Sequence, residues 1–192
     1  MKRLRPIFLE RCGLWLVLLW LPVGCEREPA PSVSGPSLSA NERQYLGAVL
    51  DNPRGRFSYR MPREWAAGKI ADSRFAVALG PRFGGYVPNI RVSREAAPLN
   101  FELYLGEARK ELERQFQGSG VEEDSAFVTS SGLAGRRWIV HTFQGGDRIW
   151  HAHYLFPGPG EDKVVVTVSA SKAEELRMGF VADACLKTLV IR

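Results

Sequence analysis

Cysteine and histidine are scarce in this chain, with three of each among 192 residues. Cys12 lies before an apolar run and Cys25 ends it, so Cys185 is left without a disulfide partner. Cys185 follows Ala184 in an apolar stretch, which is typical of a small buried side chain rather than an activated nucleophile. The sequence also lacks Cys-x-x-Cys, His-Glu-x-x-His, Gly-x-Ser-x-Gly and phosphate-loop motifs. We therefore expect a protein that is not an enzyme.

The chain also lacks a concentration of charge of one sign. Its formal net charge is +5, from 26 Lys and Arg against 21 Asp and Glu. Residues 1–24 hold four of the basic residues and one acidic residue, so the rest of the chain carries only +2. Acidic and basic residues are mixed along this part without a basic cluster. This composition argues against nucleic acid as a partner.

No apolar run is long enough for a stable transmembrane helix. Leu14–Val23 has ten residues, whereas crossing about 30 Å of hydrocarbon takes about 20. A basic head followed by such a run is typical of a signal peptide. Val23-Gly24-Cys25 resembles the lipobox of bacterial lipoproteins, although Pro22 stands where that motif usually has Leu. We expect a signal peptide over residues 1–24 and a lipid on Cys25; cleavage nearby or an uncleaved anchor are the alternatives.

Residues 26–41 are rich in Pro and Ser and poor in apolar side chains, so they cannot bury enough surface to fold. We expect residues 25–44 to form a lipidated cysteine and a flexible tether, which holds the following domain roughly 20–25 Å from the membrane. Ser39 with Glu42 is a candidate capping box for a short helix. Residues 42–50 could equally form a first strand, and the sequence leaves this choice open.

Residues 45–192 alternate between strand and helix signals, as expected for one domain. Asn100–Gln117 has an apolar stripe at helical spacing, with Asn100 as N-cap and Gly118 at its end. A second helix, about Lys172–Thr188, is predicted to pack through Leu176, Phe180, Val181 and Ala184. The predicted strands are Phe57–Met61, Phe75–Leu79, Asn89–Arg94, Ala126–Ser130, Arg136–Gln144, Arg148–Phe156 and Lys163–Ala170.

These elements predict an α+β fold. Gly145-Gly146-Asp147 indicates a hairpin turn of three residues, and Gly/Pro-rich turns between other strands favour antiparallel pairing. Each amphipathic helix can cover one face of a sheet. We expect an α/β/α sandwich with a central antiparallel sheet of about six to seven strands flanked by two main helices.

Four short motifs follow one another along residues 45–192. They are Phe57-Ser58-Tyr59-x-x-Pro62-x-x-Trp65, Pro88-Asn89-Ile90-x-Val92, a strand led by Gly135, and Phe180-x-x-x-Ala184-Cys185-x-x-Thr188-Leu189. Together they resemble the PsbP-like family, which includes the extrinsic photosystem II protein and the DcrB-like bacterial lipoproteins. Thr188-Leu189 replaces the more typical Ser-Phe. The resemblance implies an α/β/α sandwich and a non-enzymatic binding or assembly role.

The three histidines fall in one predicted hairpin. A three-residue turn pairs Gln144 with Arg148, which places His141 opposite His151, with His153 two residues further along the same face. Three imidazoles on one face could bind Zn²⁺ or Cu²⁺. A turn of two or four residues would move His141 to the other face. The alternative is that all three are structural residues of a half-buried sheet.

The loop Arg82–Pro88 is rich in Gly and Pro and carries Phe83 and Tyr86. It could form the lip of a binding site, or its aromatic side chains could fold back onto the domain.

Two functions are compatible with these features. The leading hypothesis is a lipoprotein exported to the periplasmic or cell-surface side of a bacterial membrane. Its domain would bind or assemble with another envelope protein and need no cofactor. The alternative is a metal-binding lipoprotein that uses His141, His151 and His153.

Overall fold

The computed structural model describes residues 35–116 and 120–192. The predicted signal peptide, Cys25 and the first part of the predicted tether lie outside the described residues, as does Gly118. The described residues belong to one compact unit. Among them, no helix combines the length and apolar character needed to cross a membrane.

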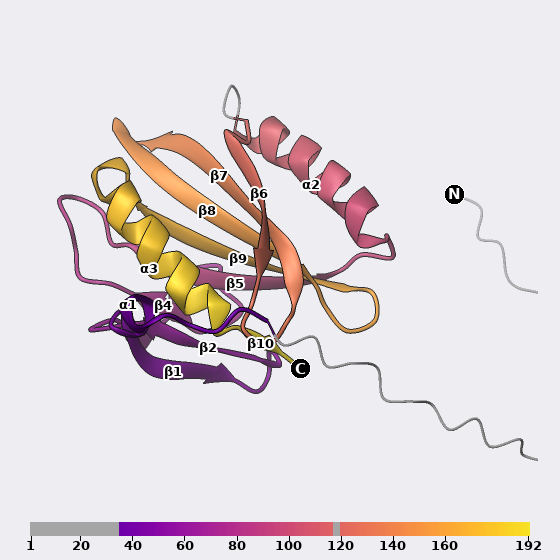
Figure 1. Ribbon diagram of the computed structural model, residues 1–192. Helices are drawn as coiled ribbons and strands as arrows, with labels where there is room; N and C mark the ends of the chain where they lie inside the picture. Colours follow the sequence, from indigo (N-terminus) through magenta and orange to yellow (C-terminus); the bar gives the residue numbers. More distant parts are fainter. Residues whose placement is uncertain (1–34, 117–119) are drawn as a thin grey trace, which may run out of the picture. The chain divides into compact units, whose positions relative to one another are not determined.

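Within the described residues, ten antiparallel strands form two sheets (Figure 1). The larger sheet has the strand order β3-β4-β5-β9-β8-β7-β6, and the smaller has the order β1-β2-β10. The larger sheet consists of β3 (Ala66–Gly68), β4 (Val77–Leu79), β5 (Asn89–Ala96), β6 (Glu123–Val128), β7 (Ala134–Gln144), β8 (Asp147–Pro157) and β9 (Asp162–Ser171). The smaller consists of β1 (Leu46–Asn52), β2 (Phe57–Pro62) and β10 (Val190–Ile191).

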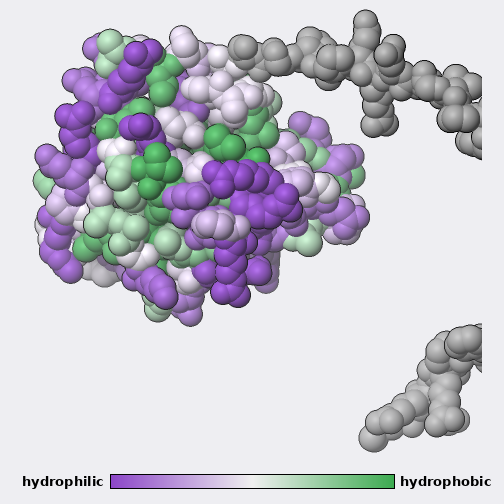
Figure 2. Space-filling view, turned by 90° about the horizontal axis from the view of Figure 1, so that it is seen from below, coloured by the Kyte–Doolittle hydropathy of each residue, from purple (hydrophilic) through white to green (hydrophobic). Residues whose placement is uncertain are grey.

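Helices cover both faces of the larger sheet. Helix α2 (Phe101–Gln115) lies on one face, and α3 (Glu175–Lys187) lies on the other, beside the smaller sheet (Figure 1). A short helix α1 (Ala40–Arg43) precedes β1, and a 3-10 turn η1 (Lys172–Glu174) leads into α3. The predicted α+β sandwich, with a central antiparallel sheet of about six to seven strands and two main helices, is therefore confirmed. Seen from below (Figure 2), its surface shows hydrophobic areas between hydrophilic stretches.

Strand alternation builds a hydrophobic core on each face of the larger sheet. On β9, Val164, Val166 and Val168 enter the core under α3 and the smaller sheet, whereas Val165 packs with the core under α2. On β7, Ile139 joins the first core and Val140 joins the second. Because successive side chains of a strand point to opposite faces, both faces of the central strands contribute buried side chains to a core.

Helix α2 forms as its sequence predicts. The Leu103 backbone N–H donates to Asn100 Oδ1 at 2.9 Å, so Asn100 is the N-cap. Tyr104, Leu105 and Leu112 are buried on the face that contacts the sheet. The opposite face carries charged residues and faces solvent.

Helix α3 packs through a different stripe from the predicted one. Met178, Val181, Ala182, Ala184, Cys185 and Leu186 are buried. Val181 and Ala184 were expected there, but Leu176 and Phe180 are 78% and 64% exposed. The physical reason is the helical period, since Leu176 and Met178 are about 200° apart around the axis. The sequence prediction assigned apolar residues from both the buried and the exposed side of this helix to the core.

At the start of the domain, residues 42–50 include both structures that the sequence allowed, the end of a short helix and most of a first strand. Ser39 and Glu42 form the capping box of α1, and the chain then continues into β1. The folded part begins earlier than the predicted tether boundary at residue 44. Leu38 packs against the core, and Glu42 forms an ion pair with Lys187 of α3. These contacts attach the end of the predicted tether to the domain.

The hairpin between β7 and β8 turns through two residues instead of three. Gln144 pairs with Asp147, so the turn consists of Gly145 and Gly146. Their φ angles are +61° and +92°, in the left-handed region that two-residue hairpins require. Glycine adopts this region without a steric penalty. This corrects the predicted register by one residue.

Two glycine substitutions should change stability in opposite directions. Gly106 lies on the exposed face of α2 with open space around it, so Gly106→Ala should stabilise the fold by about 0.5–1 kcal/mol. Gly146→Ala also has open space, but its positive φ should cost about 1–2 kcal/mol. Urea unfolding of both variants checks this. Equal effects would contradict the two-residue turn.

Candidate functional site

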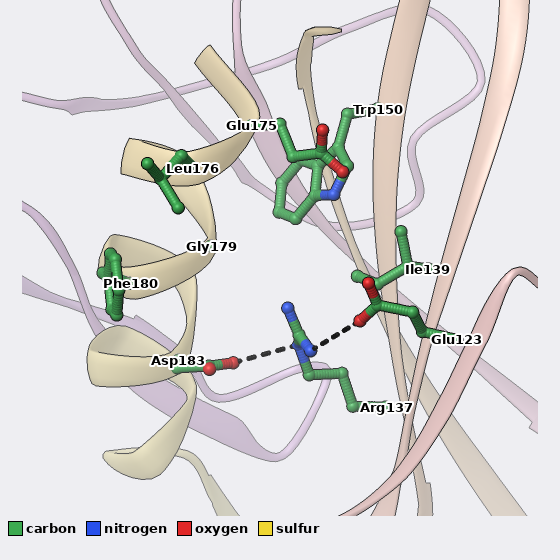
Figure 3. A pocket seen from close by; sticks show the side chains of 9 residues that line it. All are labelled: Glu123, Arg137, Ile139, Trp150, Glu175, Leu176, Gly179, Phe180 and Asp183. Carbon is green, nitrogen blue, oxygen red and sulfur yellow. Dashed lines mark ion pairs between the residues drawn. The ribbon is translucent and has the colours of Figure 1, made fainter.

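A cleft of about 280 Å³ lies between α3 and the β6–β8 part of the larger sheet. We call it the α3 cleft (Figure 3). Strand residues form one wall, and the outward side of α3 forms the other. Its lining residues are Glu123, Arg137, Ile139, Trp150, Glu175, Leu176, Gly179, Phe180 and Asp183.

Arg137 lies at the centre of the α3 cleft, between two carboxylates (Figure 3). Its Nε is 3.2 Å from Asp183 Oδ1 on α3, and its Nη1 is 3.8 Å from Glu123 Oε2 on β6. The Tyr154 hydroxyl donates to the same Asp183 Oδ1 at 2.6 Å. Burial, with the nearby Asp183 charge, raises the pKa of Tyr154 well above its usual value. Arg137 is only 19% exposed, so it is a partly buried charge held by ion pairs.

A second group of charges lies beside the α3 cleft. His141 Nδ1 is 2.8 Å from Glu122 Oε1, and its Nε2 is 3.1 Å from Glu175 Oε1. Arg148 and Lys172 pair with these two carboxylates. The hydrogen bond from His141 lowers the pKa of Glu122. This network connects the residue before β6 with β7, β8, η1 and the start of α3.

The rim of the α3 cleft is apolar on the helix side. Leu176 and Phe180 are four residues apart, so they lie next to each other on the exposed side of α3. The lining holds three acidic side chains against one Arg. The arrangement suits a ligand that is apolar in part and positively charged in part. The single Arg of the lining is held in ion pairs with Glu123 and Asp183.

The predicted cluster of three histidines does not form. His151 and His153 lie on the face covered by α2, with ring centroids 6.0 Å apart. His141 pairs with Trp150 and lies on the α3 face, because the turn has two residues. Among residues 35–116 and 120–192, no group of three or more His, Cys, Asp or Glu side chains is arranged to hold a metal ion.

The two histidines under α2 bond to hydroxyl side chains. His151 Nδ1 is 2.8 Å from Ser169 Oγ, and its Nε2 is 2.8 Å from Thr142 Oγ1. His153 Nδ1 is 3.1 Å from Thr167 Oγ1. Burial, assisted by neighbouring positive charge, lowers the pKa of His151 to about 4 and that of His153 to about 3. Both are therefore neutral at physiological pH.

The other predicted positions have separate locations. Phe83 is half exposed, Tyr86 is partly buried, and the two pair across a narrow turn. They line a shallow hollow with Asp147 and Lys172, apart from the α3 cleft. Cys185 is buried, as predicted, and burial raises the pKa of its thiol to about 12.

Sequence reasoning missed most of the α3 cleft. Consecutive acids before a strand are usually solvated, yet Glu122, Glu123 and Asp124 each lie within salt-bridge distance of a side chain of β7. The adjacent basic residues Arg136 and Arg137 carry the complementary charge and could have indicated pairing with these acids. Leu176 and Phe180 were assigned to the core, because an apolar residue on a helix is usually buried.

The fold is shared with PsbP-like proteins. No family model matches the chain, and no curated protein matches it by sequence. Among solved structures, it is similar to CyanoP, the cyanobacterial PsbP of Synechocystis sp. PCC 6803 (TM-score 0.55, 8% identity, covering 77% of this chain and 94% of that one). The resemblance seen in the sequence is thereby confirmed for the fold.

Two further solved structures share this fold. One is LpqN of Mycobacterium tuberculosis, described as involved in cell envelope biogenesis (TM-score 0.55, 14% identity, covering 70% of this chain and 82% of that one). The other is a protein of unknown function from Pseudomonas aeruginosa (TM-score 0.55, 14% identity, covering 76% and 96%). At these identities the similarity shows a shared fold only. The chemistry of the site is therefore inferred from this chain's own residues.

The histidines under α2 should make stability depend on pH. Above about pH 6.5 both are neutral in the folded and unfolded chains. Below about pH 6.5, these two histidines bind protons in the unfolded chain but not in the folded chain. The free energy of unfolding therefore falls by up to about 2.7 kcal/mol per pH unit. This loss continues until the pH nears the folded pKa values of about 4 and 3.

Urea unfolding between pH 7.5 and 5 measures this dependence, above the range where carboxylates titrate. His153→Phe should remove about half of the slope, because one of the two buried imidazoles is then absent. Its denaturant m-value should match the wild type, which controls for a change in the unfolded state. A flat wild-type profile over this range would contradict the assignment.

Proposed function

We propose that this chain is an exported lipoprotein, anchored to a bacterial membrane through Cys25, whose PsbP-like domain binds another envelope protein at the α3 cleft. The role is binding or assembly rather than catalysis. One observation carries the proposal: Leu176 and Phe180 are exposed at the rim of an acidic cleft, on a helix whose opposite side already fills the core.

Apolar exposure and charge together define the partner. A partner segment with a large apolar side chain would cover Leu176 and Phe180, burying surface at about 25 cal/mol per Å². A neighbouring Lys or Arg of the partner would meet Glu123, which is the most exposed acid of the cleft. Such an apolar centre with a polar rim is typical of protein interfaces.

The location of the domain supports the same role. The basic head, short apolar run and Val23-Gly24-Cys25 favour export and lipid attachment. A domain held near a membrane by a short tether meets other envelope proteins at high local concentration. LpqN, which shares the fold, is described as involved in cell envelope biogenesis. The metal-binding alternative required His141, His151 and His153 on one face of the sheet, but His141 lies on the other face.

Lipid attachment can be tested in cells with a fatty-acid analogue. The wild-type chain should incorporate the label, and Cys25→Ser should abolish incorporation, since the thiol is the acylated group. Cys185→Ser is the matched control, because Cys185 is buried and should leave labelling unchanged. Equal labelling of wild type and Cys25→Ser would exclude Cys25 as the anchor.

The binding surface can be tested by photo-crosslinking in cells. A photoreactive amino acid at Leu176 should give a discrete adduct with an envelope protein. The matched control is Leu103, which is 59% exposed on α2, on the opposite face of the sheet. Glu123→Lys should lower the Leu176 adduct several-fold, because it reverses a charge that the partner's basic side chain would meet.

Two results would reject the α3 cleft as the binding surface. One is an adduct pattern that is the same at Leu103 and Leu176. The other is an adduct whose yield is unaffected by Glu123→Lys, provided that circular dichroism shows the variant to be folded.

A further inference from the structure

A second cavity lies on the opposite face of the molecule, between α2 and the larger sheet. Its volume is about 260 Å³. Leu112 of α2 and Phe116, directly after α2, line it on one side, and Trp138, Leu155 and Val165 line it from the sheet. It shares no lining residue with the α3 cleft. It is therefore a separate site from the α3 cleft.

Two buried nitrogen atoms in this lining have no hydrogen-bond partner among the described residues. They are Trp138 Nε1 and His153 Nε2. Trp138 is only 2% exposed. The two residues pair directly across β7 and β8, so their side chains are neighbours on the same face. A buried polar atom without a partner is unfavourable, so a bound polar group would be stabilised at this position.

The chemistry of the two nitrogens restricts that group. The Trp138 indole N–H can only donate, so its partner must accept a hydrogen bond. His153 Nδ1 already contacts Thr167 Oγ1, which leaves Nε2 as the atom available to a ligand. A hydroxyl group can accept from Trp138 and can donate to, or accept from, His153 in either tautomer. A hydroxyl therefore matches the hydrogen-bonding chemistry of both atoms.

Charge and shape restrict the rest of the ligand. The rim carries Glu95 and Glu111 against Arg91, so an anion gains no net attraction. A cation would meet the donor hydrogen of Trp138. The aromatic side chains of Phe116 and Trp138 favour a ring. A cavity of about 150 Å³ holds benzene, so the larger space here accommodates one substituted ring.

We propose that the cavity under α2 binds a small uncharged molecule that has an aromatic ring and one hydroxyl group, with the hydroxyl between Trp138 Nε1 and His153 Nε2. The alkylphenols are the simplest members of this class. This site is independent of the α3 cleft, and it would give the domain a small-molecule ligand in addition to a protein partner.

The test compares 4-propylphenol with propylbenzene, which has the same shape without the hydroxyl. The full chain is reconstituted in phospholipid nanodiscs with ¹⁵N-labelled tryptophan, and empty nanodiscs correct for partition into lipid. The phenol should shift the indole N–H resonance of Trp138, identified with Trp138→Phe. Propylbenzene should bind about tenfold more weakly, because it leaves both nitrogens unpaired.

A variant pair locates the hydroxyl. His153→Phe keeps an aromatic ring but removes Nε2, so it should weaken 4-propylphenol binding about tenfold and leave propylbenzene unaffected. Leu103→Ala, on the outer side of α2, should bind both as the wild type does. Equal binding of the two ligands would overturn the proposal. So would an unchanged Trp138 resonance up to the solubility limit, which would mean that the cavity holds water only.

Discussion

The register of β7 on β8 is the constraint on which both surfaces of this molecule depend. The Gly145-Gly146 turn holds two residues at positive φ and pairs Gln144 with Asp147. Because side chains alternate along a strand, this pairing sends Arg137, Ile139 and His141 toward α3, and Trp138, Val140 and Thr142 toward α2. A shift of one residue would exchange the two sets and break both cores.

The alternation also separates polar side chains by the type of partner that they contact. On the α3 side the cleft is open to water, and Arg137 and His141 are paired with carboxylates. On the α2 side the covering helix removes water, and His151 and His153 bond to neutral hydroxyls instead. The cost of burying an unpaired charge explains this division, since burial favours the neutral form of each imidazole. The same sheet therefore presents two chemically different faces.

Periodicity predicted the elements of the fold well. The strands of the hairpin and α2 with its Asn100 cap all follow local patterns of two or 3.6 residues. The turn length could not be read from Gly145-Gly146-Asp147, because Asp147 is equally compatible with a turn and with the first position of a strand. Because the turn is one residue shorter than predicted, His141 lies on the other face of the sheet. The ion pairs of Arg137 could not be predicted from the sequence either, because Glu123 and Asp183 lie on different elements that meet only in the fold.

Helix α3 shows why fold and function need different arguments. Its buried stripe, centred on Met178 and Cys185, is sufficient to attach the helix to the sheet. Leu176 and Phe180 add nothing to that core, and their exposure to water is unfavourable in the isolated domain. The fold recurs in proteins that are only 8% and 14% identical to this chain, so it does not depend on particular exposed residues. Exposed apolar residues beside the Arg137 ion pairs are not required by that architecture, and the binding role proposed for the α3 cleft accounts for them.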